Sequence, residues 1–325
     1  MIKLIPETNI DFVGKRYIFF SISALLLAVS FISVAVKGPH LGLDFTGGTM
    51  IQVKFENPVE IDQLRQALDS AGLKPDIQSY TDKHSFAIRV QGKQEKVNEI
   101  GGQINEALRT AMPGVKFTNE RVEYVGPAVG RDLSKKAIWA LVLAMFGIIL
   151  YVAMRFSNPL WGTAGVIGIF HDVLITIGML SLTNRQIDLI IVAALLTIAG
   201  YSINDTIVIF DRMRENIRLN IRMPLRDVIN KSMNETLSRT INTSLTVFVA
   251  AMTLFLFGGD VINDFAFAMV IGTIVGVYST IAVATPLVYQ WSGAAKSDRG
   301  ASATPKEAPA AQTEGRPERK KHRRA

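Results

Sequence analysis

The sequence predicts an α-helical polytopic membrane protein with six transmembrane helices and one α+β domain between the first two. Two observations support this class. First, 49% of the 325 residues are hydrophobic and only 19% are charged, with a mean hydropathy of +0.26, which is too apolar for a soluble chain of this length. Second, a segment with strand and helix periodicity interrupts the apolar runs after the first of them.

Six runs are long enough to cross a hydrocarbon core of about 30 Å, which takes about 20 residues in a helix. We place them at Tyr17–Val36, Ala137–Met154, Trp161–Leu182, Ile187–Phe210, Ser238–Phe257 and Phe265–Tyr289. The first run is similar to a signal peptide, but it lacks a small-residue cleavage site and is followed by Lys37-Gly38-Pro39. We therefore predict an uncleaved span.

Basic residues indicate the orientation, because cytoplasmic loops are enriched in lysine and arginine. They gather before the first span, between spans four and five, and after span six. We predict that residues 1–16, the loop after span four and the tail at 292–325 are cytoplasmic. The formal net charge of +7 thus reflects topology, and no specific nucleic acid is expected. The tail lacks apolar periodicity and is predicted to be disordered. The sequence does not decide whether its final basic cluster contacts anionic lipid, ribosomal RNA or nothing.

Residues 37–136 are predicted to form the domain outside the cytoplasm. Thr49–Glu56 alternates as a strand, and Pro58–Leu73 has helical period, with proline at its start and glycine near its end. Two strands around a turn at Asp82-Lys83, a second helix and a closing strand follow. The order βαββαβ is that of a ferredoxin-like domain. Because no catalytic cluster is visible in it, we predict a rigid binding or coupling module.

Two glycine-rich segments connect this domain to the membrane, GLDFTGGT at 42–49 and YVGPAVGRDL at 124–133. No G-K-[ST] follows the first, so it is not a phosphate loop. The candidate connector residues are Gly47, Gly48, Gly126, Pro127 and Gly130. Such residues allow either close packing of backbones or a hinge, and the sequence leaves both open.

Polar residues inside the spans are the main functional signal, because lipid offers them no water. Span four contains Ser202, Asn204, Asp205 and Thr206, and we expect Ser202 and Tyr201 to share the helix face of Asp205. A carboxylate at this depth costs several kcal/mol. We therefore expect Asp205 to be functional, with a structural ion pair as the alternative.

Span five begins with a polar stripe. Its strictly apolar part, Leu245–Phe257, is too short to cross, so the helix must extend back and bring Arg239 to the membrane edge. Three more polar residues are predicted on the face of Arg239: Asn242, Thr243 and Thr246. Spans four and five are antiparallel, so Arg239 and Asp205 lie at compatible depth. The sequence does not determine whether they are in contact, and Arg239 is also open to a snorkelling role.

His171 and Asp172 lie near the middle of span three. Adjacent helix positions point about 100° apart, so the two side chains need not meet the same partner. A structural role and a functional role are both open for them. The chain has no cysteine, and its four histidines lack metal-ligand spacing, so no metal and no cofactor are expected.

Asp205 and Arg239 are together suited to a proton relay. Burial favours the neutral form of a carboxyl, whereas a nearby guanidinium favours the charged form. A carboxyl whose distance from a guanidinium changes can therefore take up and release a proton. No nucleotide-binding motif is present, so an ion gradient is the expected energy source.

Several motifs together resemble the SecF family of bacterial protein-export subunits: DFTGGT, YVGPAVGRDL, FHDV, GYSINDTIVIFDRMREN and LSRTINTSL. The resemblance covers Met1 to about Trp291. It implies membership of the resistance–nodulation–division superfamily, whose members run on proton or ion gradients. In this family the aspartate of I-N-D-[ST]-I-V and the arginine of R-T-[IL] are linked to proton conduction, and they correspond to Asp205 and Arg239.

The resemblance also implies a bacterial inner-membrane location and a set of partners. SecD, which carries the paired intramembrane aspartate in another chain, would be required. The SecY-SecE-SecG channel and the translocating preprotein would also be partners. YajC and YidC are further candidates, and membrane lipids would surround the complex. Two other functions stay open: a passive scaffold of the translocon or insertase, and a lipid or drug exporter. No nucleophile–base pair indicates a hydrolytic enzyme.

Overall fold

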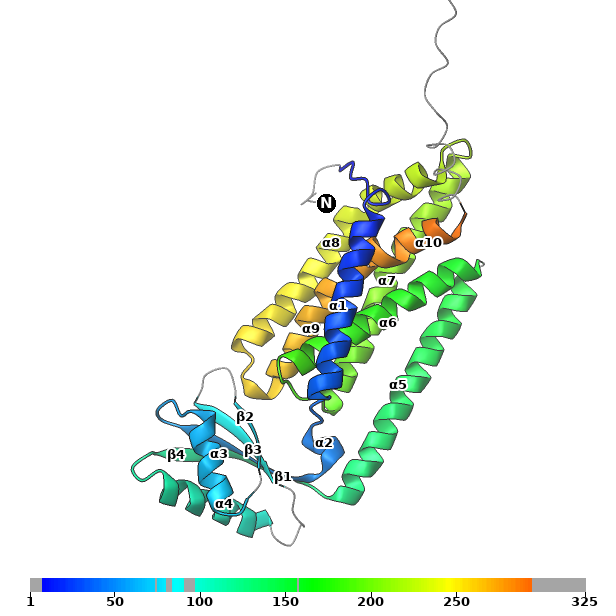
Figure 1. Ribbon diagram of the computed structural model, residues 1–325. Helices are drawn as coiled ribbons and strands as arrows, with labels where there is room; N and C mark the ends of the chain where they lie inside the picture. Colours follow the sequence, from blue (N-terminus) through cyan, green and yellow to red (C-terminus); the bar gives the residue numbers. More distant parts are fainter. Residues whose placement is uncertain (1–7, 74, 80–83, 91–96, 157, 294–325) are drawn as a thin grey trace, which may run out of the picture.

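A computed structural model describes residues 8–73, 75–79, 84–90, 97–156 and 158–293. The predicted turn at Asp82-Lys83 and nearly all of the predicted tail lie outside these residues. Six spans in the described part are long and apolar enough to cross a membrane. A four-stranded sheet lies at one end of the helix bundle, and the N-terminal segment lies at the far end (Figure 1). The predicted polytopic, mostly helical architecture is confirmed.

Each predicted apolar run lies within one membrane-spanning element of the structure or overlaps it. These are α1 (Arg16–Lys37), α5 (Pro127–Arg155), α6 (Pro159–Leu182), α7 (Leu189–Leu219), α8 (Leu225–Phe257) and a last span of α9 (Asp260–Ser279), a π-helical turn (Thr280–Ala284) and α10 (Thr285–Trp291). Helices α5, α7 and α8 extend beyond the predicted runs. Their extensions are polar enough to be solvated, so hydropathy marks the span but not the end of the helix.

Local chemistry determines where these helices begin. Pro127 and Pro159 occupy the first turns of α5 and α6, where a missing N–H costs nothing. The Asn158 side chain accepts a hydrogen bond from the Leu160 N–H at 2.9 Å, and the Asp188 side chain accepts one from the Ile191 N–H at 2.8 Å. These side chains satisfy amides that have no partner within their own helix.

The apolar run of the last span predicts one regular helix, but the structure shows an irregular one. It widens into a π-helical turn at Thr280–Ala284, directly before Pro286. Proline has no N–H for the preceding carbonyls, so the helix must rearrange in this region. The Thr280 carbonyl accepts both the backbone N–H of Thr285 and, at 2.8 Å, the Thr285 hydroxyl.

The sheet domain contains the elements β1 (Gly48–Phe55), α3 (Ile61–Ser70), β2 (Asp76–Ser79), β3 (Ser85–Val90), α4 (Val97–Ala111) and β4 (Phe117–Val125). Its strand order is β2-β3-β1-β4, with antiparallel neighbours throughout. Side chains of α3 and α4, such as Leu64 and Leu108, form one core with Ile51 and Ile88 of the strands. On the other face, Met50 packs against the short helix α2 (Leu43–Thr46).

The spans differ in how much of their surface the chain itself covers. Helices α6 and α7 and the last span are largely buried, whereas α1 and α5 expose most of their apolar side chains. Helix α5 runs along the flank of the bundle (Figure 1). An apolar surface of this extent is that of a helix in contact with lipid or with other membrane helices.

The two glycine-rich connectors pack against each other where the sheet domain meets the bundle. Gly47 has φ +68°, and a Cβ atom there would lie 3.1 Å from the Pro127 Cα. A Cβ atom on Gly130 would lie 3.2 Å from the Gly47 nitrogen. Gly48 also has positive φ at the start of β1, and Gly126 precedes α5. The structure thus shows close backbone packing at the connectors, and the hinge stays a prediction.

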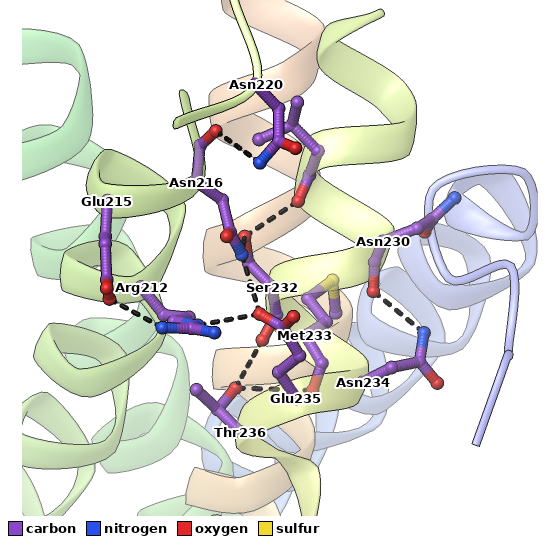
Figure 2. A network of polar contacts seen from close by, with 11 residues as sticks. Arg212, Glu215, Asn216, Asn220, Asn230, Ser232, Met233, Asn234, Glu235 and Thr236 are labelled. Atoms are coloured by element: carbon purple, nitrogen blue, oxygen red, sulfur yellow. Dashed lines mark hydrogen bonds and ion pairs between the residues drawn. The ribbon is translucent and has the colours of Figure 1, made fainter. Parts of the chain in front are cut away.

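At the far end of the bundle, α7 and α8 are joined by a polar network (Figure 2). Arg212 donates to Glu215 and to Glu235, each at 2.7 Å. The buried Asn216 amide donates to the Ser232 hydroxyl at 3.0 Å and to Glu235 at 2.7 Å. The bonds to Glu235 and Ser232 cross-link the two helices beyond the apolar part of the bundle.

The N-terminal segment lies along α8 at the same end. Asn234 accepts from the Ile10 N–H and donates to the Ile10 carbonyl, both at 2.9 Å. One turn earlier, Asn230 accepts from the Val13 N–H at 3.0 Å and donates to Asp11 at 2.7 Å. Val13 itself is fully buried in the core of the bundle. Two asparagines on one helix face thus hold the backbone of residues 8–15 against the bundle.

Candidate intramembrane site

Asp172 lies at the centre of the bundle, where α6, α7 and the last span meet. It is fully buried and accepts hydrogen bonds from the hydroxyls of Ser202 at 2.5 Å and Ser279 at 2.8 Å. Three helices are therefore held together by one carboxylate. Such a group is stable in the membrane only when partners replace the water that it has lost.

His171 contacts the same carboxylate. Its Nδ1 lies 3.0 Å from the Asp172 Oδ1, so the two neighbouring side chains contact each other. The imidazole is stacked on the Tyr278 ring, with centroids 6.1 Å apart. The Tyr278 hydroxyl in turn donates to the Phe19 carbonyl of α1 at 2.7 Å. This packing turns the imidazole back toward Asp172 and connects α1 to the polar centre.

Asp205 forms a second polar centre on the other side of α7, facing α8. The side chain is buried, with 3% of its surface exposed. Its carboxylate accepts a hydrogen bond from the Ser244 hydroxyl of α8 at 3.3 Å. Ser244 in turn accepts one from the Tyr201 hydroxyl at 2.8 Å. The chain Tyr201–Ser244–Asp205 is therefore a continuous path of exchangeable protons between two helices.

Arg239 lies near Asp205 without touching it. Within the described residues the two form no ion pair at 4 Å or less, but the guanidinium acts electrostatically on the carboxylate. The Arg239 side chain is exposed on α8. Their depth in the membrane stays a prediction, and on the question of contact the described residues show no direct ion pair between them.

The other polar residues predicted on the Arg239 face differ in how far they are buried. Thr243 and Thr246 are exposed, and their hydroxyls donate to carbonyls of their own helix. Asn242 is half-buried, and Asn204 of α7 is exposed. The predicted stripe therefore forms a polar face on the outside of the isolated chain. Ser244 faces Asp205 because it lies about 140° around the helix from Arg239.

Two residues predicted beside Asp205 belong to the Asp172 centre or its surroundings. Ser202 donates to Asp172 and not to Asp205, so its predicted position on the face of Asp205 is wrong. Thr206 lies 3.0 Å from the Thr280 hydroxyl at the π-helical turn. The turn of α7 that contains Ser202, Asp205 and Thr206 thus contacts α6 and the last span on one side and α8 on the other.

Sequence reasoning missed Ser244, Ser279, Thr280 and Tyr278 as members of these centres. A signal was present in three consecutive hydroxyl residues inside the last span, Tyr278-Ser279-Thr280. Small hydroxyl residues are common in membrane helices, however. Their role depends on how each helix is rotated, which the sequence of one chain does not show.

The fold and this site define a class of protein: a polytopic membrane protein with two buried intramembrane carboxylates and an α+β domain at one end. Residues 103–294 match the family "Protein export membrane protein SecD/SecF, C-terminal", and residues 32–59 match the "SecD/SecF GG Motif". The second match includes the connector glycines Gly47 and Gly48.

Comparison with individual proteins gives the branch of the family. The chain is 43% identical to the protein translocase subunit SecF of Endomicrobium trichonymphae, over 88% of this chain and 92% of that one. Identity is 46% to SecF of Calditerrivibrio nitroreducens, over 87% and 94%. It is 41% to SecF of Escherichia coli O157:H7, over 85% and 86%. The chain therefore belongs to the SecF family of protein translocase subunits.

Solved structures show the same likeness. The translocon-associated membrane protein SecDF of Thermus thermophilus superposes with a TM-score of 0.79 and 36% identity, over 88% of this chain. This chain spans only 39% of that longer protein. A structure of SecDF in the super-membrane-facing form superposes with a TM-score of 0.65 over 93% of this chain and 41% of the other.

Proposed function

We propose that this chain works with SecD in the Sec protein-export machinery and uses the proton gradient to promote movement of preproteins across the inner membrane. Family membership supports the export role and the SecD partner. The observation that carries gradient coupling is the buried Asp205 carboxylate, bonded to Ser244 and separated by a gap from Arg239. Asp205 is the proton-carrying group, and Arg239 favours its charged form.

In this proposal a proton passes along hydroxyl groups to the Asp205 carboxylate. The Ser244 hydroxyl donates its proton to the Asp205 Oδ2 and receives one from the Tyr201 hydroxyl. Tyr201 then takes up a proton from a donor outside this path. Neutral Asp205 is no longer attracted by Arg239, so α7 and α8 lose a force that holds them in one arrangement. Release of the proton restores that attraction.

We propose that the sheet domain lies outside the cytoplasm and acts as a ferredoxin-like coupling module. The strand order β2-β3-β1-β4 supports the fold, and the basic residues at the far end support the orientation. Both termini are then cytoplasmic. The packed connectors around Gly47, Gly126, Pro127 and Gly130 would transmit displacement between α5 and the sheet, with Gly48 at the start of β1.

SecD would cover the exposed polar face of α7 and α8. Asn204, Arg239, Thr243 and Thr246 present polar groups on the surface of the isolated chain at membrane depth. Lipid would leave them poorly solvated. A partner helix with its own aspartate would satisfy them and complete the relay. The SecY-SecE-SecG channel, YajC, YidC and the preprotein are further partners in this proposal.

The test is Asp205→Asn in the complex with SecD, reconstituted in vesicles with an imposed proton gradient. The substitution keeps the side-chain volume and removes the titrating group. We expect gradient-driven preprotein translocation and proton uptake to fall at least tenfold, with the amount of assembled complex unchanged. Asp227→Asn, at an exposed carboxylate in the first turn of α8, is the matched control. Wild-type translocation by Asp205→Asn would indicate a passive scaffold instead.

A further inference from the structure

A hollow of about 270 Å³ opens at the cytoplasmic end of the bundle, where α5 ends, α6 begins and α7 passes both. Its lining residues come from these three helices and their junction: Phe156, Asn158, Trp161, Arg214, Ile217 and Arg218. None of them takes part in the polar centres around Asp172 and Asp205. The hollow therefore needs an explanation of its own.

The floor of the hollow is aromatic. Phe210 is fully buried, and its ring meets Phe156 edge to face at a centroid distance of 5.4 Å and Trp161 at 5.5 Å. Tryptophan at the end of a span is typical of the membrane–water interface. Toward the membrane centre, α5 exposes further apolar side chains, among them Leu150 and Met154. An acyl chain leaving the hollow would meet apolar surface.

The rim of the hollow has an excess of positive charge. Arg155 pairs with Asp211, and Arg214 reaches the same carboxylate only at 3.9 Å. Within the described part of the chain, Arg218 has no hydrogen bond or ion pair. Of the three guanidinium groups, two thus share one carboxylate and the third has none within the described residues. The Arg214 guanidinium also lies 5.8 Å from the centroid of the Phe156 ring, which places the charge directly above the aromatic floor.

We propose that this hollow binds an anionic phospholipid of the cytoplasmic leaflet. Its phosphate lies between Arg214 and Arg218, and the upper part of an acyl chain lies on Phe156 and Trp161. Basic pockets between membrane helices on the cytoplasmic side suit such headgroups. A zwitterionic lipid fits less well, because its ammonium group meets the same guanidinium charges. A free phosphate ion would leave the aromatic floor uncovered.

The bound lipid would hold the cytoplasmic end of α7 at a fixed depth. Arg214 follows Asp205 by nine residues in the same helix, which corresponds to about 14 Å along its axis. Lipid binding at the hollow does not depend on proton transfer at Asp205. The two sites can therefore be tested separately.

Fluorescence quenching of Trp161 tests the proposal. The chain has three tryptophans, so the substitutions Trp139→Phe and Trp291→Phe leave Trp161 alone in the full chain. The protein is reconstituted in phosphatidylcholine vesicles with increasing fractions of brominated phosphatidylglycerol or brominated phosphatidylcholine. Because each arginine near an anionic surface contributes about fivefold, we expect half-quenching at a roughly 5- to 30-fold lower fraction of phosphatidylglycerol. Arg214→Gln with Arg218→Gln should abolish this preference.

Two matched controls show whether the headgroup preference belongs to the hollow. Trp139 is exposed on α5 outside the hollow, so a chain with Trp139 alone should show no headgroup preference. Arg222→Gln removes an exposed charge beyond the hollow and should leave the preference of Trp161 intact. Equal quenching of Trp161 by both lipids would overturn the proposal. So would loss of the preference in about 10 mM inorganic phosphate, which would identify a site for small anions.

Discussion

The Asp44 carboxylate of α2 accepts a hydrogen bond from the backbone N–H of Leu189, the first residue of α7, at 3.1 Å. Nearby, the Gly42 N–H donates to the Ile187 carbonyl and the Ile187 N–H donates to the His40 carbonyl, both at 2.7 Å. The connector below the sheet domain is thus bonded directly to the start of the helix that carries Asp205. These bonds give a direct link from the connector of the sheet domain to the helix of the proposed relay.

Removing the Asp44 cap should loosen this junction. Asp44→Ala leaves the Leu189 amide without its acceptor, and loss of a helix cap costs about 1 kcal/mol. We expect a lower melting temperature of the full chain in detergent, measured by circular dichroism. Asp44→Asn retains an acceptor oxygen and should stay close to the wild type. Equal melting of Asp44→Ala and the wild type would show that the cap contributes nothing.

Asp172 should be more important for folding than any other side chain of the polar centre. Asp172→Ala leaves Ser202, Ser279 and His171 without their acceptor in a dry interior, so we expect a loss of about 3–5 kcal/mol. Asp172→Asn keeps one acceptor and should lose about 1–3 kcal/mol. Thermal unfolding and the yield of folded protein measure both. Asp62→Asn, at an exposed pair with Arg65, is the control; a similar effect there would contradict the assignment.

Ser244 should affect transport through its bond to Asp205. Ser244→Ala breaks the path from Tyr201 to the carboxylate, and a hydrogen bond to a charged group contributes about 1.5–3 kcal/mol. We expect about a tenfold drop in gradient-driven translocation by the reconstituted complex. Thr253 lies nine residues further along α8, is exposed, and donates to the Val249 carbonyl of its own helix at 2.8 Å, so Thr253→Ala should change the rate less than twofold. If the two variants behave alike, the path does not run through Ser244.

The N-terminal segment should detach from α8 in acid. Partial burial alone would raise the pKa of Asp11, but bonds from the Gly14 N–H, Arg226 and Asn230 and the charge of Arg226 lower it below its ordinary value. The stabilisation from a lowered pKa is present above the unfolded value of about 3.9 and is lost as pH falls through the folded value.

Hydrogen exchange of residues 8–15 measures this effect. From pH 6 to pH 3 we expect protection in the wild type to fall about two- to fivefold after correction for intrinsic rates, as for an exposed ion pair. Asp11→Asn should already have the lower protection at pH 6 and should change little with acid. A wild-type protection factor that is constant across this range would rule out a contribution from Asp11.

The sequence predicted the number of spans and their approximate positions because hydrocarbon imposes a length and a composition on every span. It also drew attention to Asp172 and Asp205 as exceptional residues in apolar runs, and the structure buries both carboxylates among polar partners. Periodicity further predicted the alternation of strands and helices in the sheet domain, where buried positions such as Ile51, Leu64 and Leu108 recur with the expected spacing.

The sequence did not show which polar residues meet. Ser202 is one helical turn from Asp205, yet it bonds to Asp172 on a different helix. Thr243 follows Arg239 on its helix face, but the hydroxyl that reaches Asp205 belongs to Ser244. Such pairings depend on the rotation of each helix about its axis, and that rotation is decided by packing among all six spans. The residue pattern within one helix does not determine this rotation.

Helix α7 runs without interruption from Leu189 to Leu219, a length of about 46 Å at 1.5 Å per residue. One rigid body therefore has its first amide bonded to the connector of the sheet domain and its last turns in water on the opposite side of the membrane. An axial displacement of a few tenths of an ångström at one end is reproduced at the other without any rearrangement in between. In the proposed function, a displacement of α7 that follows proton uptake near its middle would therefore reach the connector of the sheet domain directly.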